Sequence, residues 1–263
     1  MPVKQPGFAK RLWALENGYL QDDRSALVVG EKGPVTIPCP AFLIEHERGL
    51  VLLDTGLVPA AAENAATVYG DMATRLGITL KPEHRIDRQL EALGFKTSDI
   101  DYVIMSHLHW DHTGGMYLFP QAKFFIMSGE IAYSRWPLPA SPQYRAEDID
   151  PTLGFDWTEV ESADYDFFGD GSLRFIHLPG HSPGNASLVV RLASRTIILA
   201  ADTAHLRSGL HSDKPMPSDW NTLESVRSIR KLKQLAHSLD APIWMLHDPE
   251  DWAEFKHAPE FYE

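Results

Sequence analysis

The stretch VIMSHLHWDHTGG, residues 103–115, is the most informative part of this 263-residue sequence. It places His107, His109, Asp111 and His112 directly after an apolar run and before two glycines. In an extended segment, side chains two positions apart point the same way, so His107 and His109 can face one ion. Asp111 and His112 follow where the chain is expected to turn into a helix, in which adjacent side chains diverge by roughly 100°. The spacing therefore predicts two neighbouring metal positions.

A polar surface loop whose histidines cap a helix is the alternative interpretation of this stretch. It suits a single isolated histidine, because such residues are usually structural. Four ligand-type residues at this spacing favour the metal site instead. Gly114 and Gly115 would let the backbone turn tightly around it.

Three further ligand candidates lie where other apolar strands are expected to end. His181 follows a strand in LPGHSPGN, Asp202 ends a hairpin in ILAADTA, and His247 ends the last strand in IWMLHDPE. Taken singly, each histidine has an ordinary structural explanation, and Asp202 is a candidate helix N-cap. Taken together with residues 103–115, all three are expected to be ligands of one centre.

Composition restricts the class of protein. The chain is 44% hydrophobic and 23% charged, as in globular proteins, and it is long enough to bury a core without a disulfide or a metal. Its formal net charge of −12 disfavours a general nucleic-acid or anionic-membrane surface. The lone cysteine, Cys39 in the apolar IPCPAF, is expected to be a buried and unreactive thiol rather than a nucleophile.

The start of the sequence lacks the apolar core of a secretion signal, and no window approaches the roughly 20 apolar residues of a membrane span. These features predict a cytoplasmic protein that has no membrane partner. The oligomeric state is left open, with a homodimer as one alternative.

Short apolar runs alternate with amphipathic stretches along the chain. Strands are expected as hairpins within residues 39–56 and 186–203, and singly at 100–106, 123–128, 172–180 and 241–247. Helices are expected over residues 58–76, 82–94, 128–136 and 221–236. Residues 137–171 show no clean period, which indicates an irregular insertion in a single domain spanning residues 1–263; such loops are usually functional.

The two hairpins resemble each other. One ends in Asp54-Thr55 and the other in Asp202-Thr203, and each is followed by helical sequence and then a strand that runs into a histidine. This weak repeat favours two comparable halves packed face to face. The expected fold is α/β, a four-layer αβ/βα sandwich of two mixed sheets with helices outside and the strand ends gathered at one edge.

The motifs HLHWDH, GHSPGN, AADT and MLHD together resemble the metallo-β-lactamase superfamily, and most closely its N-acyl-homoserine lactonase branch. The resemblance implies one zinc ion held by His107, His109 and His181, and a second held by Asp111, His112 and His247, with Asp202 bridging both. The all-nitrogen-and-oxygen set fits Zn²⁺ and does not exclude Mn²⁺, Fe²⁺ or Co²⁺. Asp54 matches a carboxylate that braces the histidine motif in the family, although a turn residue at a hairpin end is an equal alternative.

The function implied by this resemblance is a dinuclear zinc hydrolase that opens the lactone ring of N-acyl-homoserine lactones, which is quorum quenching. Two divalent ions roughly 3.5–4 Å apart can share a water and lower its pKa toward about 7, which gives a bridging hydroxide nucleophile. Asp111 would then pass a proton to the leaving alkoxide. Many lactonases of this branch have a tyrosine three residues after the bridging aspartate, where this sequence has His205. A histidine can also donate a hydrogen bond to the carbonyl. The alternative is that His205 is a structural loop histidine whose hydrogen bonds are made within the protein.

The small-molecule substrate needs an apolar groove for its acyl chain. Aromatic and methionine side chains in the loops are the candidates, although such residues more often pack their loop onto the core. The candidates are Trp136, Phe155, Trp157, Phe168 and Met216.

Other functions fit the sequence less well. A different lactonase or esterase, or a glyoxalase II-like thioesterase, is the main alternative, but the chain ends 16 residues after His247, without the thioesterase's usual helical region. A drug-hydrolysing β-lactamase is disfavoured by the missing secretion signal and by Asp202, where the main such enzymes have a cysteine. The acidic charge disfavours a tRNA-processing nuclease. A non-hydrolytic metal-binding module is least favoured, because flavodiiron-type relatives usually have glutamate at the position of His109.

Overall fold

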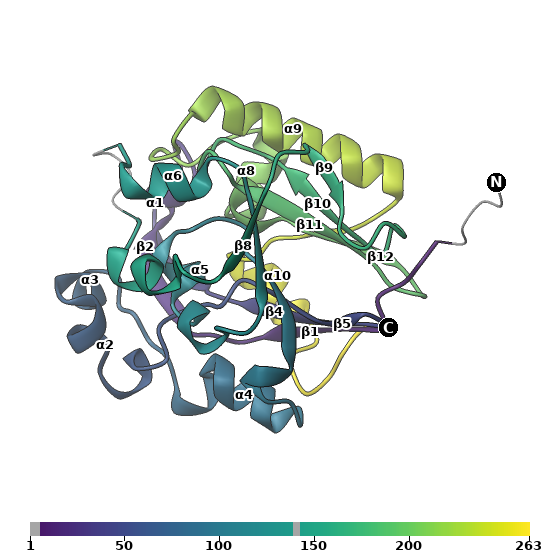
Figure 1. The fold of residues 1–263 in the computed structure, drawn as a ribbon. Helices are drawn as coiled ribbons and strands as arrows, with labels where there is room; N and C mark the ends of the chain where they lie inside the picture. The colour runs from purple at the N-terminus through teal and green to yellow at the C-terminus, as the bar shows by residue number, and fades with distance from the viewer. Residues whose placement is uncertain (1–5, 139–142) are drawn as a thin grey trace.

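The computed structural model describes residues 6–138 and 143–263. Within these residues the strands form two mixed sheets and a separate antiparallel pair (Figure 1). The first sheet has the order β1 (Arg11–Leu15), β4 (Ala41–His46), β5 (Gly49–Leu53), β6 (Ile100–Ile104), β7 (Lys123–Met127) and β8 (Asp156–Val160). The second has the order β13 (Ile243–Trp244), β12 (Thr196–Leu199), β11 (Ala186–Arg191), β10 (Leu173–His177) and β9 (Asp164–Asp166). The pair consists of β2 (Tyr19–Asp23) and β3 (Pro34–Pro38).

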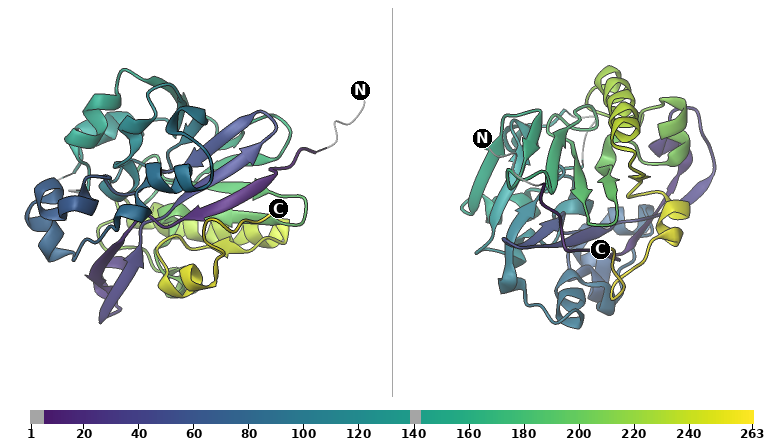
Figure 2. Two further views of the ribbon diagram at one scale, coloured as in Figure 1. Left: turned by 90° about the horizontal axis from the view of Figure 1, so that it is seen from below. Right: turned by 90° about the vertical axis from the view of Figure 1, so that its right-hand side faces the viewer.

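The two sheets pack face to face, and helices cover their outer faces (Figures 1 and 2). Helix α4 (Ile86–Ala92) lies on the outside of the first sheet, where Ile86 and Leu90 join a separate core cluster. Helix α9 (Thr222–Leu239) lies on the outside of the second sheet through Ile229 and Leu232. The arrangement confirms the expected four-layer α/β fold.

Strand β4 shows why the central strands are visible in the sequence. Phe42 and Ile44 belong to the core between the sheets, while Ala41 and Leu43 belong to the core under α4. Successive side chains of a strand point to opposite faces, so a strand covered on both faces needs a continuous apolar run.

Helix α9 matches the predicted helix at residues 221–236 and extends it by a few residues. The Asn221 side chain accepts hydrogen bonds from the backbone N–H groups of Leu223 and Glu224, which caps the N-terminus. The helix ends at Asp240, which adopts the left-handed conformation with φ 49°. Both ends are therefore set by local chemistry.

The expected helix over residues 58–76 is two helices in the structure. Helix α2 (Ala61–Tyr69) and helix α3 (Asp71–Arg75) meet at Gly70, whose φ of 57° interrupts the helix. An alanine-rich run conceals this break, because its composition favours helix on both sides of the glycine.

The expectation of an irregular insertion over residues 137–171 is wrong for much of that stretch; residues 139–142 lie outside the described residues. It contains helix α7 (Ala146–Ile149), the 3₁₀ turn η4 (Asp150–Thr152) and strands β8 and β9. Strand β8 stands at the edge of the first sheet beside β7, and β9 at the edge of the second beside β10. Edge strands carry many exposed polar residues, which removes the apolar pattern by which strands are predicted.

Strands β1, β2 and β3 were not predicted. The remaining helices and 3₁₀ turns are short: α1 (Arg24–Leu27), η1 (Pro82–His84), η2 (Thr97–Asp99), α5 (Trp110–Thr113), η3 (Met116–Leu118), α6 (Glu130–Arg135), η5 (Ala201–Thr203), α8 (Arg207–Ser212) and α10 (Pro249–Glu254). Among the described residues, no helix combines the length and apolar character needed to span a bilayer.

Strand direction explains where the polar residues gather. Strands β5 and β6 run parallel, β10 and β12 both run antiparallel to β11, and β13 runs parallel to β12. Their carboxyl ends lead into one residue each of the predicted site: Asp54, His107, His181, Asp202 and His247. In open α/β sheets, ligand sites form outside the carboxyl ends of the strands.

Candidate metal centre

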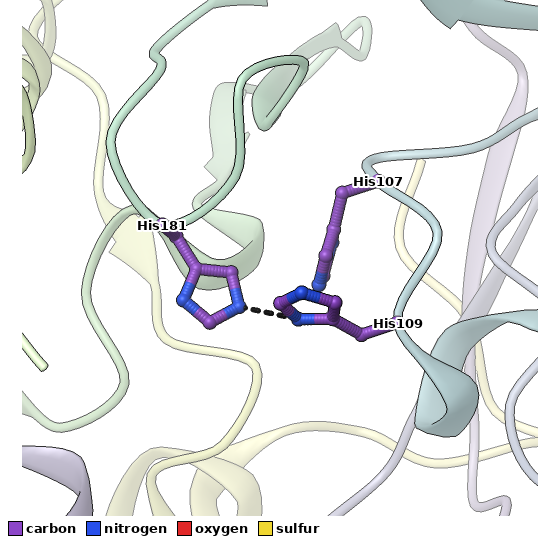
Figure 3. Close-up of side chains that lie close together, drawn as sticks. All are labelled: His107, His109 and His181. Carbon is purple, nitrogen blue, oxygen red and sulfur yellow. Dashed lines mark hydrogen bonds between the residues drawn. The ribbon is translucent and has the colours of Figure 1, made fainter. Parts of the chain in front are cut away.

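The first group of ligand-type side chains consists of His107, His109 and His181 (Figure 3). One ring nitrogen from each lies within 4.8 Å of the others. The His181 Nε2 atom is 2.8 Å from His109 Nδ1. His107 and His109 come from the loop after β6, and His181 comes from the loop after β10, so two sheets contribute to one cluster.

The second group consists of Asp111, His112 and His247. The Nε2 atoms of His112 and His247 are 3.4 Å apart. Asp111 Oδ2 is 3.7 Å from His112 Nε2 and 3.8 Å from His247 Nε2. Asp111 and His112 come from helix α5, and the His112 ring remains close to that of His107, with 4.2 Å between their centroids.

Asp202 lies between the two groups and presents one carboxylate oxygen to each. Its Oδ2 atom is 3.8 Å from His107 Nε2 and 3.3 Å from His181 Nε2. Its Oδ1 atom is 3.3 Å from His112 Nε2 and 3.2 Å from His247 Nε2. A carboxylate in this position can bind two cations at once.

Hydrogen bonds at the outer ring nitrogens orient three of the histidines. Asp54 Oδ2 accepts a bond of 2.9 Å from His112 Nδ1 and also binds the Ser106 hydroxyl. His247 Nδ1 donates to the Pro38 carbonyl oxygen at 2.7 Å. His181 Nδ1 is 2.9 Å from Asp219 Oδ1. These partners leave each Nε2 atom facing the centre, an arrangement typical of metal-bound histidines.

Sequence reasoning found Asp54 but missed Asp219 and Pro38. Asp219 lies in the loop before α9, and Pro38 contributes a backbone carbonyl at the end of β3. Neither residue is part of a ligand-type motif. No signal in the sequence could have identified these two partners.

Burial and neighbouring charges shift the pKa values of the histidines in different directions. Burial lowers the pKa of His107 and His109 well below the usual value, and neighbouring imidazoles lower it further. Burial also opposes the charged form of His112, but Asp202, Asp111 and Asp54 outweigh it and raise the pKa of His112 well above the usual value. Neutral imidazoles can bind a metal, and the carboxylates provide the negative charge that favours a divalent cation.

Two buried atoms without hydrogen-bond partners in the described part of the chain indicate that the centre can bind cations. His107 Nε2 and Asp202 Oδ1 have no hydrogen-bond partner within residues 6–138 and 143–263. Unpartnered buried polar atoms are rare in folded proteins, and a cation at each ligand group would satisfy one of these two atoms. The residues present therefore fit a pair of divalent cations.

Two more residues lie beside the centre. His205 is buried, and its Nε2 atom is 3.0 Å from Asp202 Oδ2. Cys39 is buried as expected, but its sulfur also lies within 4.8 Å of ligand atoms of Asp111 and His247. The sequence contained no indication of this position for Cys39.

A cavity of about 350 Å³ opens onto the centre. Its apolar wall comes from β2, α1, β3, α3 and the loop before α9, through Leu20, Leu27, Ile37, Met72, Leu76 and Met216. Its polar wall includes His109, Asp111, His181, Asp202, His205 and His247. Substrate-sized space therefore lies directly against the ligand-type side chains.

Most of the residues suggested for an acyl groove are not in this cavity. Phe155 and Trp157 pack against the core under α4, and Phe168 stacks on His46. Trp136 is 70% exposed. Only Met216 of the suggested set is among the residues that line the cavity. Trp157 is held elsewhere because β8 pairs with β7 at the edge of the first sheet.

Comparison with known proteins places these features in a family context. A family model described as the metallo-beta-lactamase superfamily matches residues 35–239. The N-acyl homoserine lactonase AttM of Agrobacterium fabrum is 35% identical over 260 residues, which cover 96% of this chain and 98% of the relative. An N-acyl homoserine lactonase of Bacillus cereus is 27% identical, with the same coverage of both chains.

Among solved structures, an N-acyl homoserine lactone hydrolase superposes with a TM-score of 0.85 at 24% identity, over 97% of this chain and 100% of that chain. That structure contains the product N-hexanoyl-L-homoserine at its catalytic metal centre. At this level of identity the likeness supports the fold.

Proposed function

This chain belongs to the metallo-β-lactamase superfamily, and we propose that it opens the lactone ring of N-acyl homoserine lactones. It is a metal-dependent lactonase hydrolase. The observation that carries the proposal is the pair of ligand groups joined by Asp202 at the wall of a largely apolar cavity. The named lactonases that match nearly the whole chain support the choice of substrate.

The donor set suits two divalent cations, and zinc is the identity that we propose. Imidazole nitrogens and carboxylate oxygens are common ligands of Zn²⁺ in hydrolytic sites. When bound, such a pair lowers the pKa of a shared water toward neutrality and polarises the substrate carbonyl. We assign one cation to His107, His109 and His181, the other to Asp111, His112 and His247, and Asp202 to both.

Asp111 is the residue that we assign to proton transfer. In hydrolysis, the oxygen of water bonds to the lactone carbonyl carbon while the ring C–O bond breaks, and the departing alkoxide takes up a proton. The Asp111 side chain is 12% exposed and lines the cavity, so it can reach both the water and the departing oxygen. It accepts the proton from the water and delivers it to the alkoxide.

The apolar wall of the cavity is where we place the acyl chain. Leu20, Ile37 and Met72 supply carbon surface there, and burial of each CH₂ group is worth about 0.8 kcal/mol. The lactone ring then lies against the polar wall, where the ligand groups are. This orientation puts the bond that breaks beside Asp111.

Quorum quenching would follow if the natural substrates are acyl homoserine lactone signals. The cytoplasmic location and the homodimeric alternative remain predictions from the sequence.

Titration of the acid released from N-acyl homoserine lactones of several chain lengths tests the proposal. The product is a carboxylic acid that ionises at neutral pH, so each ring opened consumes one equivalent of base. We expect rapid base uptake and close to two metal ions per chain by elemental analysis. His109→Ala and Asp202→Ala are expected to abolish the activity while the circular dichroism spectrum stays unchanged.

Two results would contradict parts of this proposal. Rapid cleavage of thioesters without any ring opening would assign the site to the thioesterase class. Full activity with one tightly bound ion per chain would rule out the two-cation centre.

A further inference from the structure

Gln143 lies beside the metal centre although it belongs to no recognised motif. Its backbone carbonyl oxygen accepts a hydrogen bond of 2.9 Å from the Trp110 N–H, next to His109. The ring of Tyr144, the following residue, packs edge-on against the His109 ring with 4.7 Å between centroids. The main chain at Gln143 is thus held directly against the loop that carries the ligand-type histidines.

The Gln143 side chain reaches across to the opposite loop. Its Nε2 atom donates to Ser218 Oγ at 3.4 Å. Ser218 immediately precedes Asp219, whose carboxylate binds His181 Nδ1. Gln143, Ser218 and His181 all line the cavity, so Gln143 forms part of the wall around a bound substrate.

The oxygen of this amide group has no hydrogen-bond partner among the described residues. Gln143 Oε1 is buried and has no hydrogen-bond partner within the described parts of the chain. A buried amide oxygen without a donor costs free energy, and such atoms are usually paired in folded proteins. Since Gln143 is one of the residues that line the cavity, a substrate bound against this wall can bring a donor to the atom.

We propose that Gln143 Oε1 accepts a hydrogen bond from the amide N–H of the N-acyl substrate and so selects N-acylated lactones over lactones without an amide. This inference rests on the proposed lactonase function and deepens it. An N-acyl homoserine lactone carries one N–H group, between its acyl chain and its ring. The apolar wall and the ligand groups lie in the same cavity as Gln143, so a substrate that spans them places this N–H within the cavity.

The chemistry of the pairing explains why one residue can determine specificity. A lactone that carries only an alkyl chain offers no donor and leaves Gln143 Oε1 unpaired. Sites built to form a hydrogen bond discriminate strongly against analogues that lack the partner. Removing the acceptor should therefore harm only the substrates that have the N–H.

The test compares two substrates of equal chain length in wild type and Gln143→Met. One is an N-acyl homoserine lactone and the other is a γ-lactone with a plain alkyl chain. Methionine keeps the length of glutamine and removes its acceptor. We expect kcat/KM for the N-acyl substrate to fall by about 10- to 100-fold, the loss expected for one buried hydrogen bond, while kcat/KM for the alkyl lactone stays nearly constant.

Met216→Leu is the matched control, because Met216 lines the same cavity without a strong hydrogen-bonding group. It should change the rates with both substrates alike. Metal content and melting temperature of Gln143→Met establish that the variant is folded and loaded. An equal loss on both substrates, or no loss on either, would overturn this inference alone. If the wild type opened neither lactone, the proposed function would fall, and this inference with it.

Discussion

At the scale of single residues, His205 is the side chain whose role is most open to experiment. It lies three positions after Asp202 and lines the cavity beside the ligand groups. Its ring stacks on that of His247, with 5.5 Å between centroids and 13° between planes. Burial lowers the pKa of His205 although Asp202 opposes this effect, and a lowered pKa favours the neutral ring with one N–H. The Nε2 atom of this ring lies 3.0 Å from Asp202 Oδ2, and once Asp202 holds cations a hydrogen on Nε2 can be donated to a lactone carbonyl instead.

We predict that His205→Phe lowers kcat by roughly 10- to 1000-fold, because a donor to the developing oxyanion is worth up to about 10³ in known sites. Phenylalanine keeps the ring and removes the donor. Steady-state kinetics and metal analysis of the purified variant provide the measurement. His211→Phe, at an exposed histidine on α8, is the matched control and should leave kcat unchanged. An unchanged kcat in His205→Phe would remove the donor role, and loss of a metal ion would make His205 a ligand instead.

At the scale of elements, Glu130 joins three segments that surround the metal centre. This fully buried residue begins α6, and its Oε1 atom accepts bonds from the Leu108 N–H at 3.0 Å and the Tyr144 hydroxyl at 2.9 Å. Its Oε2 atom accepts a bond of 2.7 Å from the Gly184 N–H. The Glu130 Cβ atom would lie 2.5 Å from a Cβ at position 184, which explains the glycine there. One carboxylate thus ties the loop after β6 to the loop after β10.

We predict that Glu130→Gln lowers the free energy of unfolding by about 1–3 kcal/mol. Glutamine has one acceptor oxygen in place of two, so a buried N–H loses its partner. Denaturant unfolding monitored by fluorescence measures the change. Glu83→Gln, at an exposed residue in η1, provides the comparison and should change stability by less than about 0.5 kcal/mol. If the two variants were equally stable, Glu130 would not hold the loops together.

At the scale of the whole molecule, stability should depend on the ionisation of Asp148 in α7. Its carboxylate binds Arg145 at 2.7 Å, and Arg145 in turn donates to the Val68 carbonyl oxygen of α2. Burial raises the pKa of Asp148 to about 6, although Arg145 and the Thr113 hydroxyl act in the opposite direction. Glu147, beside it in the chain, raises the pKa further. The folded protein therefore holds this proton more tightly than the unfolded chain does.

Because the pKa of Asp148 is higher in the folded protein than in the unfolded chain, stability should fall as the pH rises. A carboxyl group whose pKa is raised by folding stabilises the protein fully below its unfolded value, near 3.8, and the contribution is lost as the pH rises through about 6. We predict that the stability of wild type relative to Asp148→Asn falls by about 2–3 kcal/mol between pH 4 and 7, at about 1.4 kcal/mol per unit. Chemical denaturation of both proteins across this range measures it. A relative stability that is constant or rises with pH would contradict the prediction.

Much of the architecture follows from sequence patterns that act within one element. The apolar runs at β4, β5, β6 and β11 identify strands covered on both faces, and the amphipathic run of α9 identifies its helix. The alternation of His107 and His109, and the turn into α5 at Asp111, set the directions of those side chains locally. Strands β1, β2, β3, β8 and β9 escaped prediction because they are short or lie at edges, where apolar periodicity is weak.

The sequence by itself determined which residue types could bind cations and that they stand at the ends of strands. Only the tertiary structure decided that Asp202 offers one oxygen to each ligand group, that Asp219 and Pro38 orient histidines from distant segments, and that Gln143 lines the cavity. Local spacing sets the direction of a side chain only relative to its own backbone. The meeting of distant segments depends on how two sheets pack and where their strands end, and that information is spread over the whole core.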